Sequence, residues 1–127
     1  MLEIAKIVEL AKEHATPMYL FDLDELQSRV QAMKEILGED IRLCYAMKAN
    51  PFLVEALEPQ ADRYEVCSPG EFHICVERKL PMEKIVLSGV NKEYEDVRYA
   101  MEQGVIHYTA ESRSQLELVS RCADELD

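Results

Sequence analysis

The sequence has few basic side chains for its length. Its 127 residues contain 14 Lys and Arg against 25 Asp and Glu, so the formal net charge is −11. Nucleic acids and anionic membrane surfaces are bound through clustered Lys and Arg, and we therefore expect neither as a partner. No stretch approaches the roughly 18 consecutive apolar residues of a membrane helix, and the start shows no signal-peptide pattern. These absences predict a cytoplasmic protein the size of one domain.

The four cysteines form no C-x-x-C pair, which excludes the commonest metal and redox motifs. They are Cys44, Cys67, Cys75 and Cys122, and without a secretory signal we expect buried, reduced thiols and no disulfide framework. The nearest approach to a metal cluster is Cys67, His73 and Cys75, whose spacing matches no zinc pattern. No metal site is predicted.

The first part of the chain carries two helical patterns. Apolar residues recur at helical spacing over residues 2–13, and residues 16–21, opened by Thr-Pro, are expected to be extended. Either Asp22 or Asp24 can then cap a second helix, which Gly38 ends.

The remainder alternates between short strand-like runs, about 20 residues apart, and helical signals. Strand–helix alternation of this kind predicts β/α units on a parallel sheet, with ligands where strands end and helices begin. Each run is followed by a helix-start signal: Asn50-Pro51, the capping box Ser68–Glu71, Asn91, and Ser112 with Gln115. The expected strands are Ile41–Met47, Arg63–Cys67, Ile85–Ser88 and Val105–Thr109.

Lys48 is the candidate reactive group. Alternation along the first strand places it on one face with Cys44 and Ala46, so small side chains leave room for a ligand beside it. A lysine in such a place can supply the amine nucleophile of a Schiff base. The alternative is a lysine that simply extends from the strand end into solvent.

Ordered motifs along the chain resemble those of the fold-type III pyridoxal-phosphate enzymes, the alanine-racemase-like family. Tyr45–Asn50, Tyr-Ala-Met-Lys-Ala-Asn, is similar to the family's lysine segment. Thr16–Asp22, Tyr64–Glu71, Ile85–Lys92 and Gly104–Ser112 resemble further family segments in the same order. Within the family, the likeness is greatest to diaminopimelate decarboxylase and its ornithine and arginine decarboxylase relatives.

The resemblance implies the N-terminal half of a (β/α)8 TIM barrel, with about four β/α units and pyridoxal 5′-phosphate as cofactor. Lys48 then matches the lysine that binds the cofactor covalently. Glu65 matches an acidic residue near the cofactor, although it could instead be a strand carboxylate paired with Arg63 or Arg42. The implied reaction is decarboxylation of an amino acid, above all meso-diaminopimelate to L-lysine in lysine biosynthesis. His107 is expected to be a packing or pocket-rim residue.

The same resemblance predicts how the chain is organised. Residues 1–24 would lead into the barrel, and residues 25–127 would form a truncated part of the cofactor-binding domain. A whole barrel takes about 250 residues, so we expect an N-terminal fragment, inactive alone, of an enzyme that forms a homodimer. The alternatives are another family member (an ornithine or arginine decarboxylase, a racemase or a cofactor carrier) and a decarboxylase-like binding protein without activity.

Overall fold

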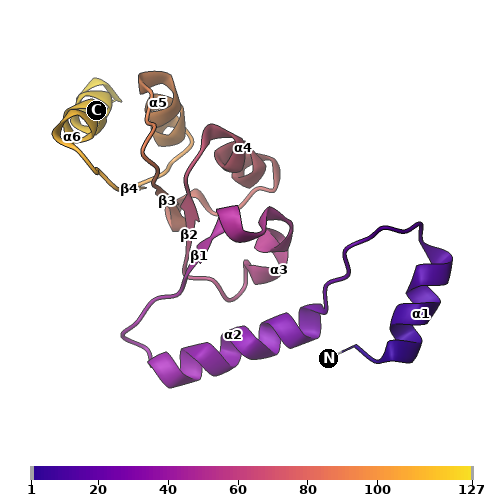
Figure 1. Cartoon of the computed structure of the whole chain (residues 1–127). Coiled ribbons are helices and arrows are strands. Elements are labelled where there is room, and N and C mark those ends of the chain that lie inside the picture. The colour runs from indigo at the N-terminus through magenta and orange to yellow at the C-terminus, as the bar shows by residue number, and fades with distance from the viewer. Residues whose placement is uncertain (1, 127) are drawn as a thin grey trace. The chain divides into compact units, whose positions relative to one another are not determined.

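A computed structural model describes residues 2–126. The chain divides into two compact units, Met1–Glu39 and Asp40–Asp127. Within residues 2–126, no helix is both long enough and apolar enough to cross a membrane. The strands are β1 (Cys44–Ala46), β2 (Arg63–Val66), β3 (Ile85–Leu87) and β4 (His107–Tyr108), and the α-helices are α1 (Ile4–Glu13), α2 (Leu23–Leu37), α3 (Val54–Leu57), α4 (Pro69–Glu77), α5 (Tyr94–Glu102) and α6 (Arg113–Leu126) (Figure 1).

The first unit holds the two predicted helices, α1 and α2. Asp22 caps α2, because its Oδ1 accepts a hydrogen bond of 3.0 Å from the Glu25 amide. Asp24, the other candidate cap, lies in the first turn instead. The helix ends at Gly38, whose positive φ of 77° suits glycine and whose N–H donates to the Lys34 carbonyl. Both the helix and its ends are therefore as predicted, with Asp22 as the cap.

The second unit contains a four-stranded sheet in the order β1-β2-β3-β4, and all three strand pairs are parallel. This confirms the predicted β/α arrangement. The strands are shorter than predicted, most clearly at the outer strands β1 and β4. Each of these pairs with one neighbour only in the described sheet, so fewer residues take part in a ladder.

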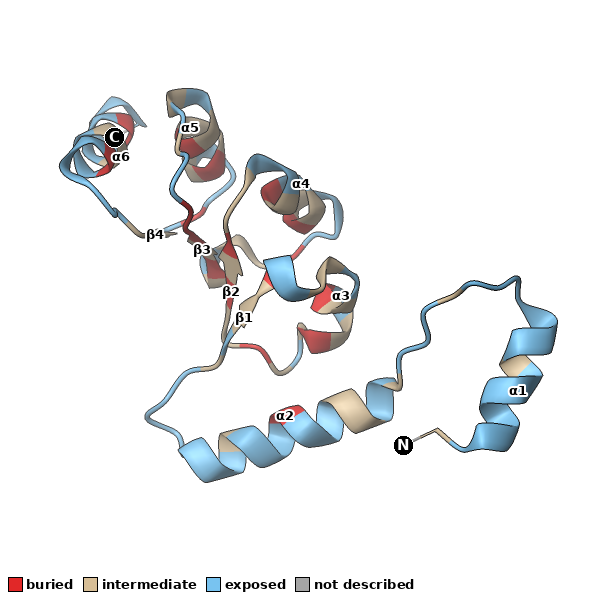
Figure 2. Ribbon diagram, in the orientation of Figure 1, coloured by how far each residue is buried: buried red, intermediate tan, exposed pale blue. Residues whose placement is uncertain are grey.

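The two faces of the sheet differ in burial. Helices α3, α4 and α5 also carry buried residues (Figure 2). On the face that α3 to α5 cover, the central strands bury apolar side chains, namely Tyr64, Val66, Ile85 and Leu87. The strand register places a second row on the opposite face, namely Ala46, Glu65, Val86 and His107. All four of these residues are only partly buried. Alternation along each strand thus separates a packed face from an accessible one.

Most of the predicted caps are found at the starts of the helices. Ser68 Oγ accepts a hydrogen bond from the Glu71 amide (3.3 Å), and Glu71 Oε2 accepts one from the Cys67 amide (2.8 Å). Asn50 Oδ1 accepts one from the Phe52 amide at 3.1 Å, at the start of a 3₁₀ turn that leads into α3. Asn91 precedes α5 as expected, but the helix begins three residues later at Tyr94.

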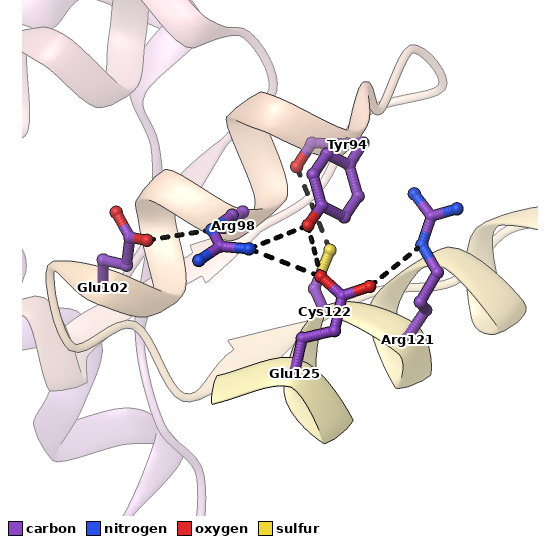
Figure 3. Close-up of polar contacts among 6 residues, drawn as sticks. All are labelled: Tyr94, Arg98, Glu102, Arg121, Cys122 and Glu125. Carbon is purple, nitrogen blue, oxygen red and sulfur yellow. Dashed lines mark hydrogen bonds and ion pairs between the residues drawn. The ribbon is translucent and has the colours of Figure 1, made fainter. Parts of the chain in front are cut away.

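A polar cluster joins α5 to α6 (Figure 3). Tyr94 donates its hydroxyl hydrogen to Glu125, and Arg98 contacts both the Tyr94 hydroxyl (2.9 Å) and Glu125 (3.3 Å). The Arg121 guanidinium lies 4.3 Å from the centre of the Tyr94 ring. The buried Cys122 thiol faces the Tyr94 carbonyl at 3.9 Å. These contacts fix α6 against α5 on the helix side of the sheet.

The cysteines are all free thiols, and their burial varies. Cys75 and Cys122 are buried as expected, and burial raises the pKa of Cys75 to about 12. Cys67 is partly buried. Cys44 is exposed, contrary to prediction, because it lies on the outer strand β1, on the face opposite the one that α3 to α5 cover. Among residues 2–126, no group of His, Cys, Asp and Glu has the arrangement of a metal site.

Candidate functional site

Lys48 lies two residues after the end of β1, at the carboxyl edge of the sheet. The strand was predicted to run to Met47, but it ends at Ala46 because the backbone enters a 3₁₀ turn at Met47–Ala49. Fully buried Met47 anchors this turn, and the Tyr45 hydroxyl closes it with a 2.8 Å hydrogen bond to the Asn50 carbonyl. The Lys48 side chain is 63% exposed. The turn therefore presents the amine to solvent from a well-anchored backbone.

Lys48 and Glu65 form an ion pair on the accessible face of the sheet. The distance from Lys48 Nζ to Glu65 Oε2 is 3.8 Å, and the Glu65 side chain is 35% exposed. Glu65 lies opposite Ala46 in the β1–β2 register. The small Ala46 side chain therefore leaves room for a ligand beside Glu65. The structure thus places the two sequence-predicted site residues side by side. Arg63, an alternative partner, directs Nη1 to the Asp62 carbonyl instead.

Cys67 belongs to the same electrostatic neighbourhood. Its thiol has a raised pKa, mainly because it is partly desolvated and secondly because Glu65 is near, while the Lys48 charge acts in the opposite direction. Cys67 comes two residues after Glu65 and directly precedes the cap of α4. The amine, the carboxylate and the thiol therefore lie around the ends of β1 and β2.

Gly89 brings the turn after β3 against the turn after β2. Its φ is +95°, and a Cβ on Gly89 would lie 2.4 Å from the Cys67 carbonyl oxygen. Only glycine fits both the backbone conformation and this close approach. Lys92, from the same turn, donates Nζ to the Gly89 carbonyl at 2.6 Å. The predicted Gly-x-x-Lys segment is therefore a tightly closed turn.

Gln115 has a role that sequence reasoning missed. It was expected only to help cap α6, and its backbone N–H does donate to Ser112 Oγ at 3.2 Å. Its side chain is buried, accepts a hydrogen bond from the Glu111 amide (2.8 Å), and donates to the Val90 carbonyl (2.8 Å) and more weakly to Gly89 (3.5 Å). It therefore ties the turn after β4 to the turn after β3. Because this contact joins two turns far apart in the chain, no local sequence pattern predicts it.

A narrow cleft lies between α4 and α5, next to the ends of β2 and β3. Phe72, Val97 and Tyr99 supply much of its apolar wall, and Cys67 and Lys92 reach its edge. Neither Lys48 nor Glu65 lines it. The paired amine and carboxylate lie on the open side of the sheet, so we place the candidate site there rather than in this cleft.

Two polar atoms on β4 and just after it lack a partner. His107 Nε2 and Thr109 Oγ1 are buried without a hydrogen bond among the described residues. The register places His107 in the same row as Glu65, with Val86 between them. This partly buried location agrees with the expected packing or pocket-rim position of His107.

The donor set on the accessible face fits an aldehyde cofactor such as pyridoxal phosphate. An exposed primary amine can attack an aldehyde carbon, and a carboxylate 3.8 Å away can hold the proton that the amine must lose. Ala46, opposite Glu65, occupies little space between them and a ligand. The residues present therefore suit the aldehyde group of such a cofactor.

Comparison with known proteins gives a consistent result. Residues 23–127 match the family profile described as pyridoxal-dependent decarboxylase, pyridoxal binding domain. Diaminopimelate decarboxylase of Aquifex aeolicus is 29% identical over 98% of the chain, and that of Zymomonas mobilis is 30% identical over 98%. The chain spans 30% and 31% of the length of these two relatives.

A solved structure supports the same fold. The crystal structure of diaminopimelate decarboxylase from Helicobacter pylori, complexed with L-lysine, superimposes with a TM-score of 0.77 at 25% identity. The alignment covers 94% of this chain and 31% of that one. The four parallel strands with their helices thus correspond to a part of a decarboxylase barrel, as the sequence predicted.

Proposed function

The chain belongs to the pyridoxal-dependent decarboxylase family, and from that membership we propose that the whole protein converts meso-diaminopimelate to L-lysine and CO₂. The observation that carries this proposal is the pairing of Lys48 with Glu65 at the sheet edge of a chain that aligns over 98% of its length with diaminopimelate decarboxylases. The Helicobacter pylori relative, solved with L-lysine, supports the choice of product.

We assign Lys48 as the residue that binds the cofactor covalently and Glu65 as its acidic neighbour. When bound, pyridoxal phosphate supplies an electron-accepting ring for the electrons released as a bond at the amino-acid Cα breaks. Lys48 contributes the attacking Nζ, and its 3₁₀ turn fixes the backbone behind that atom. Glu65 Oε2, 3.8 Å from Nζ, holds the proton that the ammonium gives up. No other residue of the chain is assigned to cofactor contact.

The remaining features of the whole protein follow from the same family assignment. We infer that residues 1–24 lead into a barrel domain that begins at residue 25, close to residue 23 where the family match starts. The whole protein would be a cytoplasmic homodimer that takes a small amino acid as substrate. With a net charge of −11 in this chain, we expect neither nucleic acid nor a membrane surface as a partner.

The proposal is tested by supplying the whole protein with pyridoxal phosphate and measuring the products of candidate substrates. Meso-diaminopimelate should give CO₂ and L-lysine, whereas L-lysine and L-ornithine should remain largely unconsumed. Lys48→Ala should lower kcat on the order of 10³-fold, within the range for loss of a directly participating group. Lys84→Ala, which removes a lysine at the start of β3, is the matched control and should retain turnover.

Cadaverine from L-lysine as the main product would overturn the choice of substrate and leave the decarboxylase assignment in place. The absence of CO₂ release from all of these amino acids, with the cofactor bound, would overturn the decarboxylase assignment itself.

A further inference from the structure

The turns at the carboxyl edge of the sheet meet at the Gly89 carbonyl. Lys92 Nζ donates to this oxygen at 2.6 Å, and Gln115 Nε2 reaches it at 3.5 Å while bonding the Val90 carbonyl at 2.8 Å. On its other side, Gly89 packs so closely on the Cys67 carbonyl that a Cβ would lie 2.4 Å away. The turns after β2, β3 and β4 are therefore linked through one residue.

The same linkage holds the end of β2, which carries Glu65. The Ser88 amide, next to Gly89, donates to the Val66 carbonyl at 2.8 Å, and Glu71 Oε2 accepts from the Cys67 amide at 2.8 Å. The backbone that directly follows Glu65 is thus held by hydrogen bonds from the end of β3 and to the first turn of α4. Any shift of the Gly89 turn is transmitted to this segment, because closely packed backbone cannot yield independently.

The Lys48–Glu65 pair is sensitive to such a shift. At 3.8 Å the two atoms lie near the limit of an ion pair, and both side chains are accessible to water. A displacement of the β2 backbone relative to the turn after β1 would therefore change the distance between the two charges.

We propose that Lys92 and Gln115 are positioning residues for the cofactor lysine. They hold the Gly89 turn against Cys67 and so fix Glu65 relative to Lys48. Lys92 is suited to this role because its amine is committed to the Gly89 carbonyl and is partly buried. Gln115 is suited because both ends of its buried amide are used, one in each turn. This inference rests on the proposed function.

The experiment compares Lys92→Met and Gln115→Leu with Lys84→Met in the whole protein. Lys84 is a matched control, because its Nζ also donates to a backbone carbonyl (Glu58, 2.9 Å), but at the opposite end of β3. Three quantities are measured: the pyridoxal phosphate concentration at half-saturation, the visible circular dichroism of the bound cofactor, and the melting temperature. The first two report how the cofactor is held, whereas a purely structural contact changes only the third.

We expect Lys92→Met and Gln115→Leu to raise the half-saturating concentration about tenfold, a modest effect for misplacement of a reacting group, and to weaken the visible dichroism. Lys84→Met should lower only the melting temperature. Lys92→Arg, which keeps a cation and its donors, should restore most of the dichroism. If Gln115→Leu does not fold, Gln115→Asn retains the amide but is too short to bridge the turns, and the same change in dichroism is expected.

An unchanged half-saturation and dichroism in the Lys92 and Gln115 variants, with melting temperatures lowered as in Lys84→Met, would overturn the positioning role and leave the proposed function intact. A wild-type protein that binds no pyridoxal phosphate would overturn both, and the control variant would then show the same absence.

Discussion

The two faces of the parallel sheet are made by alternate residues of the same strands, and they differ in burial and in chemistry. The helix-covered face is apolar and nearly closed to water, and it includes Tyr64 and Ile85, which have no exposed surface. The opposite face carries Glu65 and, at its edge, Lys48, both of which are accessible. The covered face supplies stability, whereas the accessible face supplies ionisable groups that a ligand can reach. Neighbouring residues of one strand can thus be changed with separate consequences.

The sharpest test of this division is a pair of substitutions in β3. Ile85 is fully buried on the covered face, so Ile85→Ala should lower the free energy of unfolding by about 2–5 kcal/mol, as large-to-small core changes do. Val86, the next residue, faces the accessible side and is only partly buried. Val86→Ala should cost less than about 1.5 kcal/mol by the same reasoning. Equal losses for the two, measured by denaturant unfolding of the whole protein, would contradict the division.

Glycine substitutions at the edge between the faces should have an intermediate effect. Gly89→Ala forces a side chain into a positive-φ position and against the Cys67 carbonyl, and we expect a loss of about 1–3 kcal/mol from the strain. Gly70 is the matched control, since a Cβ there meets nothing within 4 Å. Gly70→Ala should change the free energy of unfolding by less than about 1 kcal/mol. Melting curves that decline equally for both variants would show that Gly89 is not held as described.

The smallest expected effect concerns pH and the buried thiol on the covered side. Burial raises the pKa of Cys75 from 9.0 to about 12. A raised pKa in the folded state contributes stability that is complete below pH 9 and is lost as the pH rises toward 12. The resulting loss should be about 1 kcal/mol by pH 10, measured as urea unfolding at a series of pH values. Cys75→Ala should flatten this alkaline decline, and an unaltered slope would place its origin elsewhere.

The sequence predicted local features more completely than it predicted contacts between turns. Helix caps depend on residues only a few positions apart, so the sequence pattern predicts them. Examples are Asp22 at the start of α2 and the Ser68–Glu71 capping box. The parallel β/α arrangement was predicted from the regular alternation of strand-like and helical runs. The end of β1 was not predicted correctly. Alternation alone would continue the strand through Met47, but Met47 is buried and the backbone forms a 3₁₀ turn there.

The site was predictable only in part for the same reason. Lys48 and Glu65 were singled out by the segments that carry them, and the structure brings them to 3.8 Å. The bridge from Gln115 to the Val90 carbonyl joins residues 25 positions apart, and the seat of Gly89 on Cys67 is a contact between two turns. Such contacts depend on how β/α units pack side by side, which no local spacing specifies.

The central claim is that the amine on the accessible face, Lys48, is where the cofactor binds. The most direct measurement is to incubate the whole protein with pyridoxal phosphate, reduce with borohydride and locate the label by peptide mass mapping. One labelled peptide that contains Lys48 is expected, and no label at that position in Lys48→Ala. Label concentrated on Lys92 or on another lysine, or no label in the intact protein, would contradict it.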